Sequence, residues 1–316
     1  MKTNVALVIP NWNGKTQLVD CLSSLKIQSA EAKVVVVDNG STDGSIEIVQ
    51  QKFPEVSLVC LDKNYGFAGG VNRGIESVVN DVEYVALLNN DAIVDRDWLK
   101  YLMSAIKERP GIGIVTGKLM RDDKKHIDST GEFVRISGMP YPRGRDEIDE
   151  GQYEKAEYVF AATGGASLYR TEMLKKIGLF DESFFAYFED VDISFRAQLA
   201  GWKVWYEPRA LAYHHIGSTS SKLGSFTRYH SVKNFILLYN KNMPGSLYWK
   251  YKPLFLWQLV RMKLGSIRDL QFWAFIKGFF VGALLIPSTL TKRRAIQKSR
   301  KVSIEYIDAL LVHGKK

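Results

Sequence analysis

The sequence predicts an α/β protein, with a sheet flanked by helices and a helical, amphipathic C-terminal region. Three observations predict this fold. Short apolar runs alternate with helical patterns in the first half of the chain, which is typical of strands and their connecting helices. Polar, glycine-rich clusters follow the apolar runs directly. From residue 226 the composition becomes aromatic and basic.

Four apolar runs, at residues 5–9, 34–37, 56–60 and 84–88, have the length of buried strands. Strands that alternate with helices of ~10–15 residues form βαβ units, in which the strands are parallel. Apolar residues at helical spacing connect the first run to the second and the second to the third. These positions are Leu18, Cys21, Leu22 and Leu25, followed by Ile46, Ile48, Val49 and Phe53.

The composition sets the class of protein. With 46% hydrophobic residues among 316, the chain can bury a core, which excludes global disorder. Only two cysteines are present, Cys21 and Cys60, which excludes a disulfide-stabilised mini-protein, and we expect both to be reduced. The first apolar run is too short for a signal peptide. The length suggests two domains, which we place at residues 1–225 and 226–316.

The net charge of +9 is unevenly distributed. Residues 226–316 carry 17 Lys and Arg against 3 Asp and Glu, whereas residues 1–225 carry 26 against 31. A basic region joined to an acidic body favours an anionic partner, either lipid headgroups or nucleic acid. No helix-turn-helix, zinc or RNP-type signature accompanies the basic region, so nucleic acid is the less favoured partner.

Three polar clusters, at residues 11–14, 38–44 and 89–91, come directly after apolar runs. Ligands of open α/β sheets bind beyond the carboxyl ends of the strands, so we expect these clusters to form one site. Residues 121–157 are polar and contain several glycines and prolines. We predict that they form a long, mobile loop beside the site.

Asp38 ends a run of four valines. Its carboxylate either accepts the imide N–H of uracil or thymine, or caps the following helix. The segment at residues 64–74 is rich in glycine, which lets a backbone approach a ligand closely. Its glycine spacing fits neither a dinucleotide-binding motif nor a Walker loop. Within it, Arg73 either contacts a phosphate or is a surface residue.

Asp91 is a candidate ligand for a divalent metal beside a diphosphate group. His214 and His215 follow another apolar strand, and strand alternation allows only one of them to face the site. A neutral imidazole there would be a second metal ligand. The alternatives are a strand-terminating turn for Asp91 and a structural role for the histidines.

Three carboxylates, those of Glu189, Asp190 and Asp192, fall within four residues. Asp192 and Arg196 are four residues apart on a predicted helix, which favours an ion pair. Glu189 and Asp190 would then lie at the helix N-terminus, where a carboxylate can take the proton of an attacking hydroxyl. Helix capping by acidic residues is the alternative.

In this order and spacing, the motifs resemble those of family 2 glycosyltransferases with the GT-A fold, a Rossmann-like mixed sheet flanked by helices. The resemblance covers about residues 4–235 and is closest to a rhamnosyltransferase-like branch. The matching motifs are Val8-Ile-Pro-Asn-Trp-Asn13, Asp38-Asn-Gly-Ser-Thr-Asp-Gly44, residues 64–74, Leu87-Leu-Asn-Asn-Asp91, Thr163-Gly-Gly-Ala166 and Phe188-Glu-Asp190-x-Asp192-x-x-x-Arg196.

The resemblance implies that Asp190 is the catalytic base. It also implies that Asp91 binds Mg²⁺ or Mn²⁺ together with His214, or with His215 instead. Asn89 stands where the family's Asp-x-Asp motif has its first acid, so Asp91 would be the only carboxylate ligand of that motif.

The remaining roles implied by the resemblance concern binding. Tyr229 and the Lys233–Asn234 pair match a stretch that we interpret as a phosphate or lid contact. Nucleotide and donor binding would involve Pro10, Asn11, Asn13, Asp38, Asn39, Ser41, Asn64, Gly66, Phe67, Asn72, Arg73, Asn89 and Asn90, and the acceptor and donor sugar would meet Gly164, Gly165, Glu189 and Arg196.

The resemblance further implies an inverting, metal-dependent transferase. Processive members carry Gln-x-x-Arg-Trp, but Gln258–Met262 lacks the tryptophan, which favours transfer of a single sugar. The expected donor is dTDP-L-rhamnose, with a UDP-sugar as the alternative, and the expected acceptor is a lipid-linked or polysaccharide glycan. A nucleotidyltransferase is a rival class, but residues 11–14 are not its basic, glycine-rich loop.

Residues 272–287 form an apolar, aromatic stretch interrupted by Lys277, shorter than the ~20 residues that span a bilayer. A basic cluster follows at residues 292–301. This pattern favours a helix lying in the interface of an anionic cytoplasmic leaflet, and hence a peripheral enzyme at the inner face of the cell membrane. The alternative is a homodimer interface.

Overall fold

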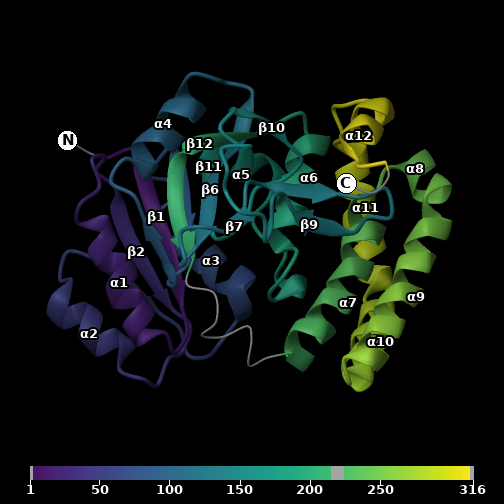
Figure 1. Cartoon of the computed structure of the whole chain (residues 1–316), viewed down its shortest axis with the longest axis horizontal. Coiled ribbons are helices and arrows are strands. Elements are labelled where there is room, and N and C mark those ends of the chain that lie inside the picture. Colours follow the sequence, from purple (N-terminus) through teal and green to yellow (C-terminus); the bar gives the residue numbers. More distant parts are fainter. Residues whose placement is uncertain (1–2, 215–223, 314–316) are drawn as a thin grey trace.

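The structure is a computed structural model that describes residues 3–214 and 224–313. A mixed sheet lies between helices, and a group of C-terminal helices packs beside it (Figure 1). The strands are β1 Val5–Asn11, β2 Lys33–Asp38, β3 Ser57–Cys60, β4 Tyr84–Leu88, β5 Ala92–Val94, β6 Ile112–Arg121, β7 Ile127–Ser129, β8 Glu132–Val134, β9 Pro140–Pro142, β10 Glu157–Val159, β11 Ala166–Arg170 and β12 Lys203–His214. The helices are α1 Lys15–Leu25, α2 Ser45–Lys52, α3 Gly66–Glu76, α4 Trp98–Lys107, α5 Thr171–Ile177, the 3-10 helix η1 Glu182–Phe184, α6 Glu189–Leu199, α7 Gly224–Asn242, α8 Gly245–Lys250, α9 Lys252–Arg268, α10 Phe272–Leu284, α11 Ile286–Lys298 and α12 Ile304–Leu310.

The four strands predicted from the apolar runs are confirmed as β1 to β4. β1 pairs in parallel with both β2 and β4, and β2 pairs in parallel with β3. The register places Asn11 opposite Asp38, so two of the polar clusters leave the sheet side by side. Helix α1 connects β1 to β2 and α2 connects β2 to β3, as the spacing predicted.

The rest of the sheet makes it mixed. Strand β11 runs antiparallel to β4 and to β6, and β12 pairs in parallel with β6. The full order is β10-β12-β6-β11-β4-β1-β2-β3, with β5 on β12 and β7 on β6. Because β12 ends at His214 and pairs with β5, the sheet brings His214 opposite Ala92, next to Asp91.

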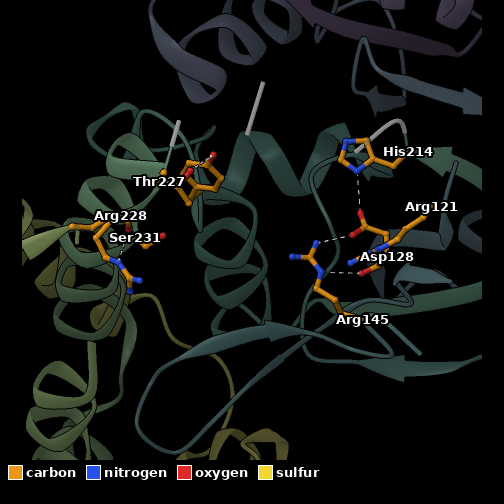
Figure 2. Close-up of a pocket in the computed structure, with 10 residues that line it drawn as sticks. Arg121, Asp128, Arg145, His214, Thr227, Arg228 and Ser231 are labelled. Carbon is orange, nitrogen blue, oxygen red and sulfur yellow. Dashed lines mark hydrogen bonds and ion pairs between the residues drawn. The ribbon is translucent and has the colours of Figure 1, made fainter. Parts of the chain in front are cut away.

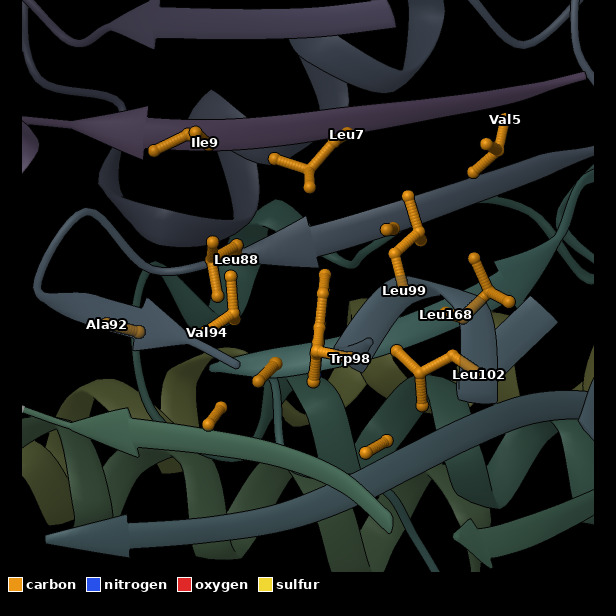
Figure 3. Packing of buried hydrophobic residues seen from close by; sticks show 14 of the residues in the cluster. Val5, Leu7, Ile9, Leu88, Ala92, Val94, Trp98, Leu99, Leu102 and Leu168 are labelled. Carbon is orange, nitrogen blue, oxygen red and sulfur yellow. The ribbon is translucent and has the colours of Figure 1, made fainter. Parts of the chain in front are cut away.

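Side-chain alternation along β1 explains why both faces of the sheet are covered. Val5, Leu7 and Ile9 point to one face, where they pack with residues of α1, α2 and α4, including Trp98 (Figure 3). Ala6 and Val8 point to the other face, toward α3, α5 and α6. Burial on both faces is why these strands are continuously apolar rather than alternating.

The prediction of a long loop at residues 121–157 is wrong. The segment contains β7, β8 and β9, and β10 begins at its last residue, Glu157. The β8–β9 hairpin forms a small sheet of its own, and Glu132 forms backbone hydrogen bonds with Ala161 at 2.8 and 3.2 Å. Its prolines are placed at an edge: Pro140 and Pro142 both lie in β9, a strand of a two-stranded sheet. The segment therefore presents its polar side chains from an ordered scaffold.

The C-terminal helices α7 to α12 share an apolar cluster with α6 and the β8 segment. The predicted apolar stretch at residues 272–287 is divided at Leu285 between α10 and α11. In the described ranges, no single helix has the length and hydropathy to cross a membrane. Helices α10 and α11, bent by 55°, meet that test of length and composition only as a pair.

Candidate active site

Asp38 is held at the end of β2 by a network that begins on β1. Its Oδ1 accepts a hydrogen bond of 3.1 Å from Asn11 Nδ2, and its Oδ2 accepts one of 2.8 Å from the Ser41 backbone N–H. Asp38 therefore stabilises its own turn, and the alternative that it caps the next helix is wrong. Asp43 does that work, because its carboxylate accepts from the backbone N–H of Ser45. Base binding by Asp38 would use the remaining lone pairs of its two oxygens.

Asn13 and Ser41 complete this network. Asn13 has a positive φ of 50°, and its backbone N–H donates to Ser41 Oγ at 2.9 Å. The Asn13 side chain accepts from the Thr42 backbone at 2.8 Å. Pro10, the residue before the last one of β1, pairs with Val37 in the parallel register. The structure thus brings four of the predicted nucleotide-binding residues, Pro10, Asn11, Asn13 and Ser41, to the same edge as Asp38.

The glycine-rich segment is held in shape by two asparagines. Asn39 donates to the Gly66 carbonyl at 2.9 Å and accepts from the Tyr65 N–H at 3.1 Å. Asn64 accepts from the Gly66 N–H at 2.7 Å. Gly66 has a φ of +76°, and a Cβ there would lie 2.5 Å from the Phe185 carbonyl oxygen. The glycine is therefore required by a close approach between this segment and residue 185.

Asn72 and Arg73 lie elsewhere than the prediction implied. Asn72 is buried and exchanges hydrogen bonds of 2.9 and 3.0 Å with the backbone of Phe180. Arg73 forms an ion pair with Glu182. Both side chains hold α3 to the segment before α6, and neither lines the cavity around Asp190. Phe67, in contrast, does line that cavity.

A cavity of about 430 Å³ lies between the end of the sheet and the N-terminus of α6. It brings together predicted residues that are far apart in the chain. Asp190 and His214 both border it, as do the glycines of the predicted sugar-binding segment. The lining includes Phe67, Asn89, Asp128, Glu132, Tyr141, Arg145, Gly164, Gly165, Glu189, Asp190 and His214.

Asp190 is oriented by two backbone donors. Its Oδ2 accepts from the Gly164 N–H and its Oδ1 from the Val191 N–H, both at 2.8 Å. A Cβ at Gly164 would lie 3.3 Å from the Asp190 Cβ, so a side chain there would crowd the carboxylate. Burial raises the pKa of Asp190 despite the two hydrogen bonds. A carboxylate with a raised pKa and a fixed orientation is suited to accept a proton.

Glu189 and Glu132 surround Asp190 with further carboxyl groups. Burial, followed by the charge of Asp190, raises the pKa of both well above the ordinary range. Glu189 Oε2 is buried without a hydrogen-bond partner, and so are Asn89 Oδ1 and the Tyr141 hydroxyl. Buried polar atoms almost always find a partner, and all three of these residues line the cavity. They are therefore positioned to bind hydroxyl groups of a ligand.

His214 joins two aspartates. Its Nε2 lies 3.1 Å from Asp91 Oδ1 and its Nδ1 lies 3.0 Å from Asp128 Oδ2. Figure 2 shows His214, Asp128 and Arg145 in this chain of contacts, in which Arg145 donates to Asp128 at 2.8 Å. Burial opposes the charged imidazole, but the bonds to Asp128 and Asp91 outweigh it and raise the pKa of His214 to about 10. His215 lies outside the described residues.

The residues around Asp91 have donor atoms of the kind that bind a divalent cation, although they do not form a complete coordination shell. In the parts of the chain that the structure describes, no group of three or more His, Cys, Asp or Glu has the arrangement of a metal site. Asp91 and His214 offer one oxygen and one nitrogen within 3.1 Å of each other, and Asn89 Oδ1 is an unpartnered acceptor two residues away. Oxygen and imidazole donors suit Mg²⁺ and Mn²⁺, with the remaining positions left for a diphosphate.

Three further predictions concerned α6 and α7. The predicted ion pair of Asp192 with Arg196 is confirmed at 2.9 Å. Arg196 does not reach the cavity, because its guanidinium is buried and donates to the carbonyls of residues 177–179. Lys233 and Asn234 are 4% and 0% exposed and bind backbone carbonyls, so they are not a phosphate contact.

Two other predicted residues fall in different places. Asn90 donates to Asn11 Oδ1 at 2.7 Å, and so connects the Asp91 turn to the Asp38 network. Tyr229 lies on α7 with Lys277 above its ring at 5.3 Å, beside α10.

Sequence reasoning missed the four polar cavity residues that come from residues 121–157, namely Asp128, Glu132, Tyr141 and Arg145. No periodic pattern marks them, and their segment was interpreted as a loop. One signal was available: Asp128 directly follows the apolar residue Ile127, as Asp38 directly follows Val37.

Comparison with known proteins assigns the chain to a family. The family described as "Glycosyltransferase like family 2" matches residues 3–230. A curated relative, the poly-beta-1,6-N-acetyl-D-glucosamine synthase of Staphylococcus epidermidis, is 28% identical over 221 residues, which are 68% of this chain and 50% of the relative. The chain therefore spans about half the length of the curated relatives it matches.

Solved structures share the fold. A mannosyltransferase from Pyrobaculum calidifontis, PcManGT, in complex with GDP-Man and Mn²⁺ has a TM-score of 0.57 and 15% identity, over 98% of this chain and 84% of that one. S. aureus TarS residues 1–349 in complex with UDP has a TM-score of 0.55 and 17% identity, over 94% and 91% of the two chains. This chain therefore has a GT-A fold and belongs to the glycosyltransferase-like family 2.

Proposed function

We propose that this enzyme transfers a single sugar from a nucleoside diphosphate donor to a hydroxyl group of a glycan acceptor, with inversion at the anomeric carbon. The observation that carries the proposal is the shared cavity of Asp190 and His214. A buried carboxylate with a raised pKa lies in the same cavity as the imidazole bonded to Asp91. This shared cavity supports the proposal that a proton acceptor and a diphosphate-binding region belong to one site.

In the proposed reaction, Asp190 accepts the proton of the acceptor hydroxyl as that oxygen attacks the anomeric carbon. The bond from the anomeric carbon to the diphosphate breaks, and the electron pair leaves with the nucleoside diphosphate. Gly164 and Val191 hold the Asp190 carboxylate toward the attacking hydroxyl through their N–H groups. A divalent cation, Mg²⁺ or Mn²⁺, bound by Asp91 and His214 would offset the charge of the leaving diphosphate.

The base and the sugar of the donor follow from the motif resemblance. We propose dTDP-L-rhamnose as the donor, with a UDP-sugar as the second candidate. Asp38 suits either, because uracil and thymine present the same imide N–H. The second candidate is supported by the UDP complex of TarS and by the N-acetyl-D-glucosamine polymer named for the curated relative.

A donor screen tests this function directly. The enzyme is incubated with labelled dTDP- and UDP-sugars and an acceptor extract, and the nucleotide product is identified. Release of dTDP or UDP together with acceptor labelling is the expected result. Release of inorganic pyrophosphate would instead establish nucleotidyl transfer. Absence of any product with every donor would contradict the proposal, since the motifs around Asp38 would then bind no nucleotide sugar.

The acceptor is proposed to be carried on a lipid, and the surface of α9 and α10 supports this. Large apolar side chains are exposed on both helices and on the turn between them: Trp257 of α9 is 59% exposed, Leu270 of the turn 93% and Trp273 of α10 79%. Monomeric proteins rarely expose large apolar patches without a partner. We define this surface as the α9–α10 face, formed by Leu256, Trp257, Val260, Leu264, Ile267, Leu270, Trp273, Phe280 and Leu284.

Charge selects an anionic membrane as the partner of the α9–α10 face. The C-terminal region carries 17 basic residues against 3 acidic ones, and each basic side chain near an anionic surface contributes about 1 kcal/mol. Tryptophan is suited to the bilayer interface, since its ring is apolar and its N–H is polar. We therefore place the enzyme peripherally at the inner, cytoplasmic face of the cell membrane.

Vesicle flotation tests the membrane partner. We expect the protein to float with vesicles that contain anionic phosphatidylglycerol, and more weakly with neutral phosphatidylcholine alone. The double variant Trp257→Ser/Trp273→Ser should remain at the bottom of the gradient. Ile27→Ser, which alters a residue that is 61% exposed elsewhere on the surface, is the matched control and should float. Flotation with neither vesicle, together with a dimer in sedimentation velocity, would assign the face to a second copy of the chain.

A further inference from the structure

The segment that leads into α6 has an unusual backbone. Phe185, Tyr187 and Phe188 have φ angles of 65°, 71° and 70°. Bulky side chains disfavour positive φ, so three such residues within four positions persist only when their surroundings enforce the conformation. The segment ends one residue before Glu189, the first residue of α6, and two before Asp190. Its shape therefore sets where α6 begins and how the Asp190 carboxylate is aimed.

Asn234 on α7 supplies that enforcement. Its Nδ2 lies 3.0 Å from the carbonyl oxygen of Phe184, 2.7 Å from that of Ala186 and 2.6 Å from that of Tyr187. The Asn234 side chain is fully buried, so water cannot replace it. The two N–H hydrogens of this amide thus reach the carbonyls of Phe184, Ala186 and Tyr187, of which the Phe184 carbonyl also accepts from the Ala186 N–H at 2.8 Å.

Two neighbouring contacts act on the same segment. Lys233, also buried, donates from Nζ to the carbonyls of Ser183 at 2.5 Å and Phe184 at 3.2 Å. On the opposite side, the Phe185 carbonyl accepts from the Ala68 N–H at 3.2 Å, close to Gly66. The segment is therefore fixed between α7 and the glycine-rich turn of α3.

Helix α7 is itself fixed by the C-terminal helices. Gly278 and Gly282 of α10 allow the two helices to touch: a Cβ at Gly278 would lie 2.5 Å from the Tyr229 carbonyl, and one at Gly282 3.0 Å from Ile236. The contact chain thus runs from α10, which carries part of the α9–α10 face, through α7 to the segment before Asp190.

We propose that Asn234 is a positioning residue, which holds residues 184–188 in their irregular conformation and thereby aims Asp190 into the cavity. The inference rests on the proposed role of Asp190 as the base. It assigns the C-terminal helices a part in the active site, although none of their side chains acts on the substrate in this proposal.

The first experiment compares Asn234→Ala with Asn240→Ala. Asn240 is a matched control because it lies on the same helix, is 2% exposed, and its side chain donates to the Ile236 carbonyl and accepts from the Tyr248 hydroxyl. Asn234→Ala should lower kcat by about 10- to 100-fold with the donor KM little changed, the loss typical of a misplaced catalytic group. Asn240→Ala should leave kcat close to that of the unaltered enzyme. Equal kcat values in the two variants would overturn the proposal.

The second experiment uses backbone preference as the readout. Phe188→Ala and Phe188→Gly remove the same aromatic ring, but only glycine adopts positive φ without strain. When combined with Asn234→Ala, the glycine should restore kcat several-fold relative to the alanine. A role for Asn234 in global stability alone predicts no such difference, and equal kcat values in the two double variants would refute the positioning role.

Hydrogen exchange makes the test independent of the reaction. Amides of residues 184–192 should exchange faster in Asn234→Ala than in Asn240→Ala, because local opening becomes easier. If Asn234→Ala does not fold, Asn234→Ser is measured in its place. If the unaltered protein has no transferase activity but exchange is faster in Asn234→Ala, the positioning role of Asn234 is supported and the proposed reaction is rejected. An unchanged exchange rate at residues 184–192 would reject the positioning role of Asn234.

Discussion

Asp190 and Asp192 lie two residues apart on the first turn of α6, yet their surroundings are opposite. Asp192 accepts from Arg196 at 2.9 Å, from Lys241 at 2.8 Å and from Asn242 at 2.8 Å. Within residues 3–214 and 224–313, Asp190 accepts hydrogen bonds from the backbone N–H groups of Gly164 and Val191 alone, and its carboxyl neighbours are Glu189 and Glu132.

The opposite pKa shifts of the two aspartates follow from these neighbours. Burial would raise the pKa of both carboxyl groups. In Asp192 the charges of Lys241 and Arg196 outweigh burial and lower it. In Asp190 burial prevails and the pKa is raised. Although both side chains are buried, Asp192 is suited to an ion-pair network and Asp190 to proton transfer. The difference arises because Arg196 of α6 and Lys241 of α7 pair with Asp192.

The largest expected effect is that of Asp190→Asn. The amide keeps the shape of the side chain but cannot accept the proton, so kcat should fall by about 10²- to 10⁴-fold. Donor binding, measured by the shift in melting temperature on adding the nucleotide sugar, should be retained.

Glu189→Gln is the control for that experiment, since it neutralises a buried carboxyl on the same turn. It should change sugar affinity more than kcat, because the unpartnered Glu189 Oε2 is positioned to bind a hydroxyl. If Glu189→Gln abolishes turnover and Asp190→Asn does not, Glu189 rather than Asp190 is the base, and the comparison of Asp190 with Asp192 no longer explains the choice of base.

Asp192→Asn should affect the other property, the free energy of unfolding. Lys241 and Arg196 would lose a buried counter-charge, which typically costs about 3–5 kcal/mol. Urea denaturation measures this loss. The kcat of the folded fraction should stay near normal. A marked fall in kcat without loss of stability would show that the Asp192 network also acts on the reaction.

Asp128→Asn tests whether the partner of His214 affects metal binding. Asp128 is buried and holds His214 Nδ1 at 3.0 Å. Loss of such a carboxylate behind a ligating histidine typically weakens metal affinity by about 10- to 100-fold. Calorimetric titration with Mn²⁺ measures it in the presence of UDP. An unchanged affinity would exclude His214 as a ligand and leave the Asp128–His214 pair a structural contact.

The smallest expected effect is a difference between the pH at which kcat falls and the pH at which the protein unfolds, and it compares Asp190 directly with Asp192. Burial opposes the charge of Asp181 and Asp192, but Lys241 holds their pKa values below the ordinary range. A depressed folded pKa contributes stability above the unfolded pKa, and this contribution disappears as the pH falls below about 4. In the proposed reaction Asp190 acts only when deprotonated, and its pKa is raised.

The kcat should therefore fall at a higher pH than the folded fraction does on acidification. Parallel measurement of kcat and far-UV circular dichroism checks this order. Coincident loss of activity and structure would mean that the Asp190 pKa is not raised in the folded enzyme.

Sequence reasoning predicted the positions of polar residues correctly where these residues directly follow a strand. Asp38 and Asp91 were found because polar residues after apolar runs lie at the carboxyl edge of a parallel sheet. The roles that the family resemblance implied for Asn72, Arg73 and Arg196 gain no support from the structure, because these side chains find partners in residues 177–182. Hydrogen-bond partners more than a hundred residues away, such as Phe180 for Asn72, cannot be inferred from local spacing.

What the sequence determined by itself is the order of strands and helices in the first half, the helix that carries Asp190, and the family, because each depends on periodicity or on short motifs. The tertiary structure decided which polar groups meet across the fold. It brought Asp128 and Glu132 into the cavity from a segment without regular pattern, and it turned Lys233 and Asn234 inward to bind backbone carbonyls. Periodicity is a property of neighbours along the chain, whereas charge pairing and burial depend on contacts that only the folded sheet and helices create.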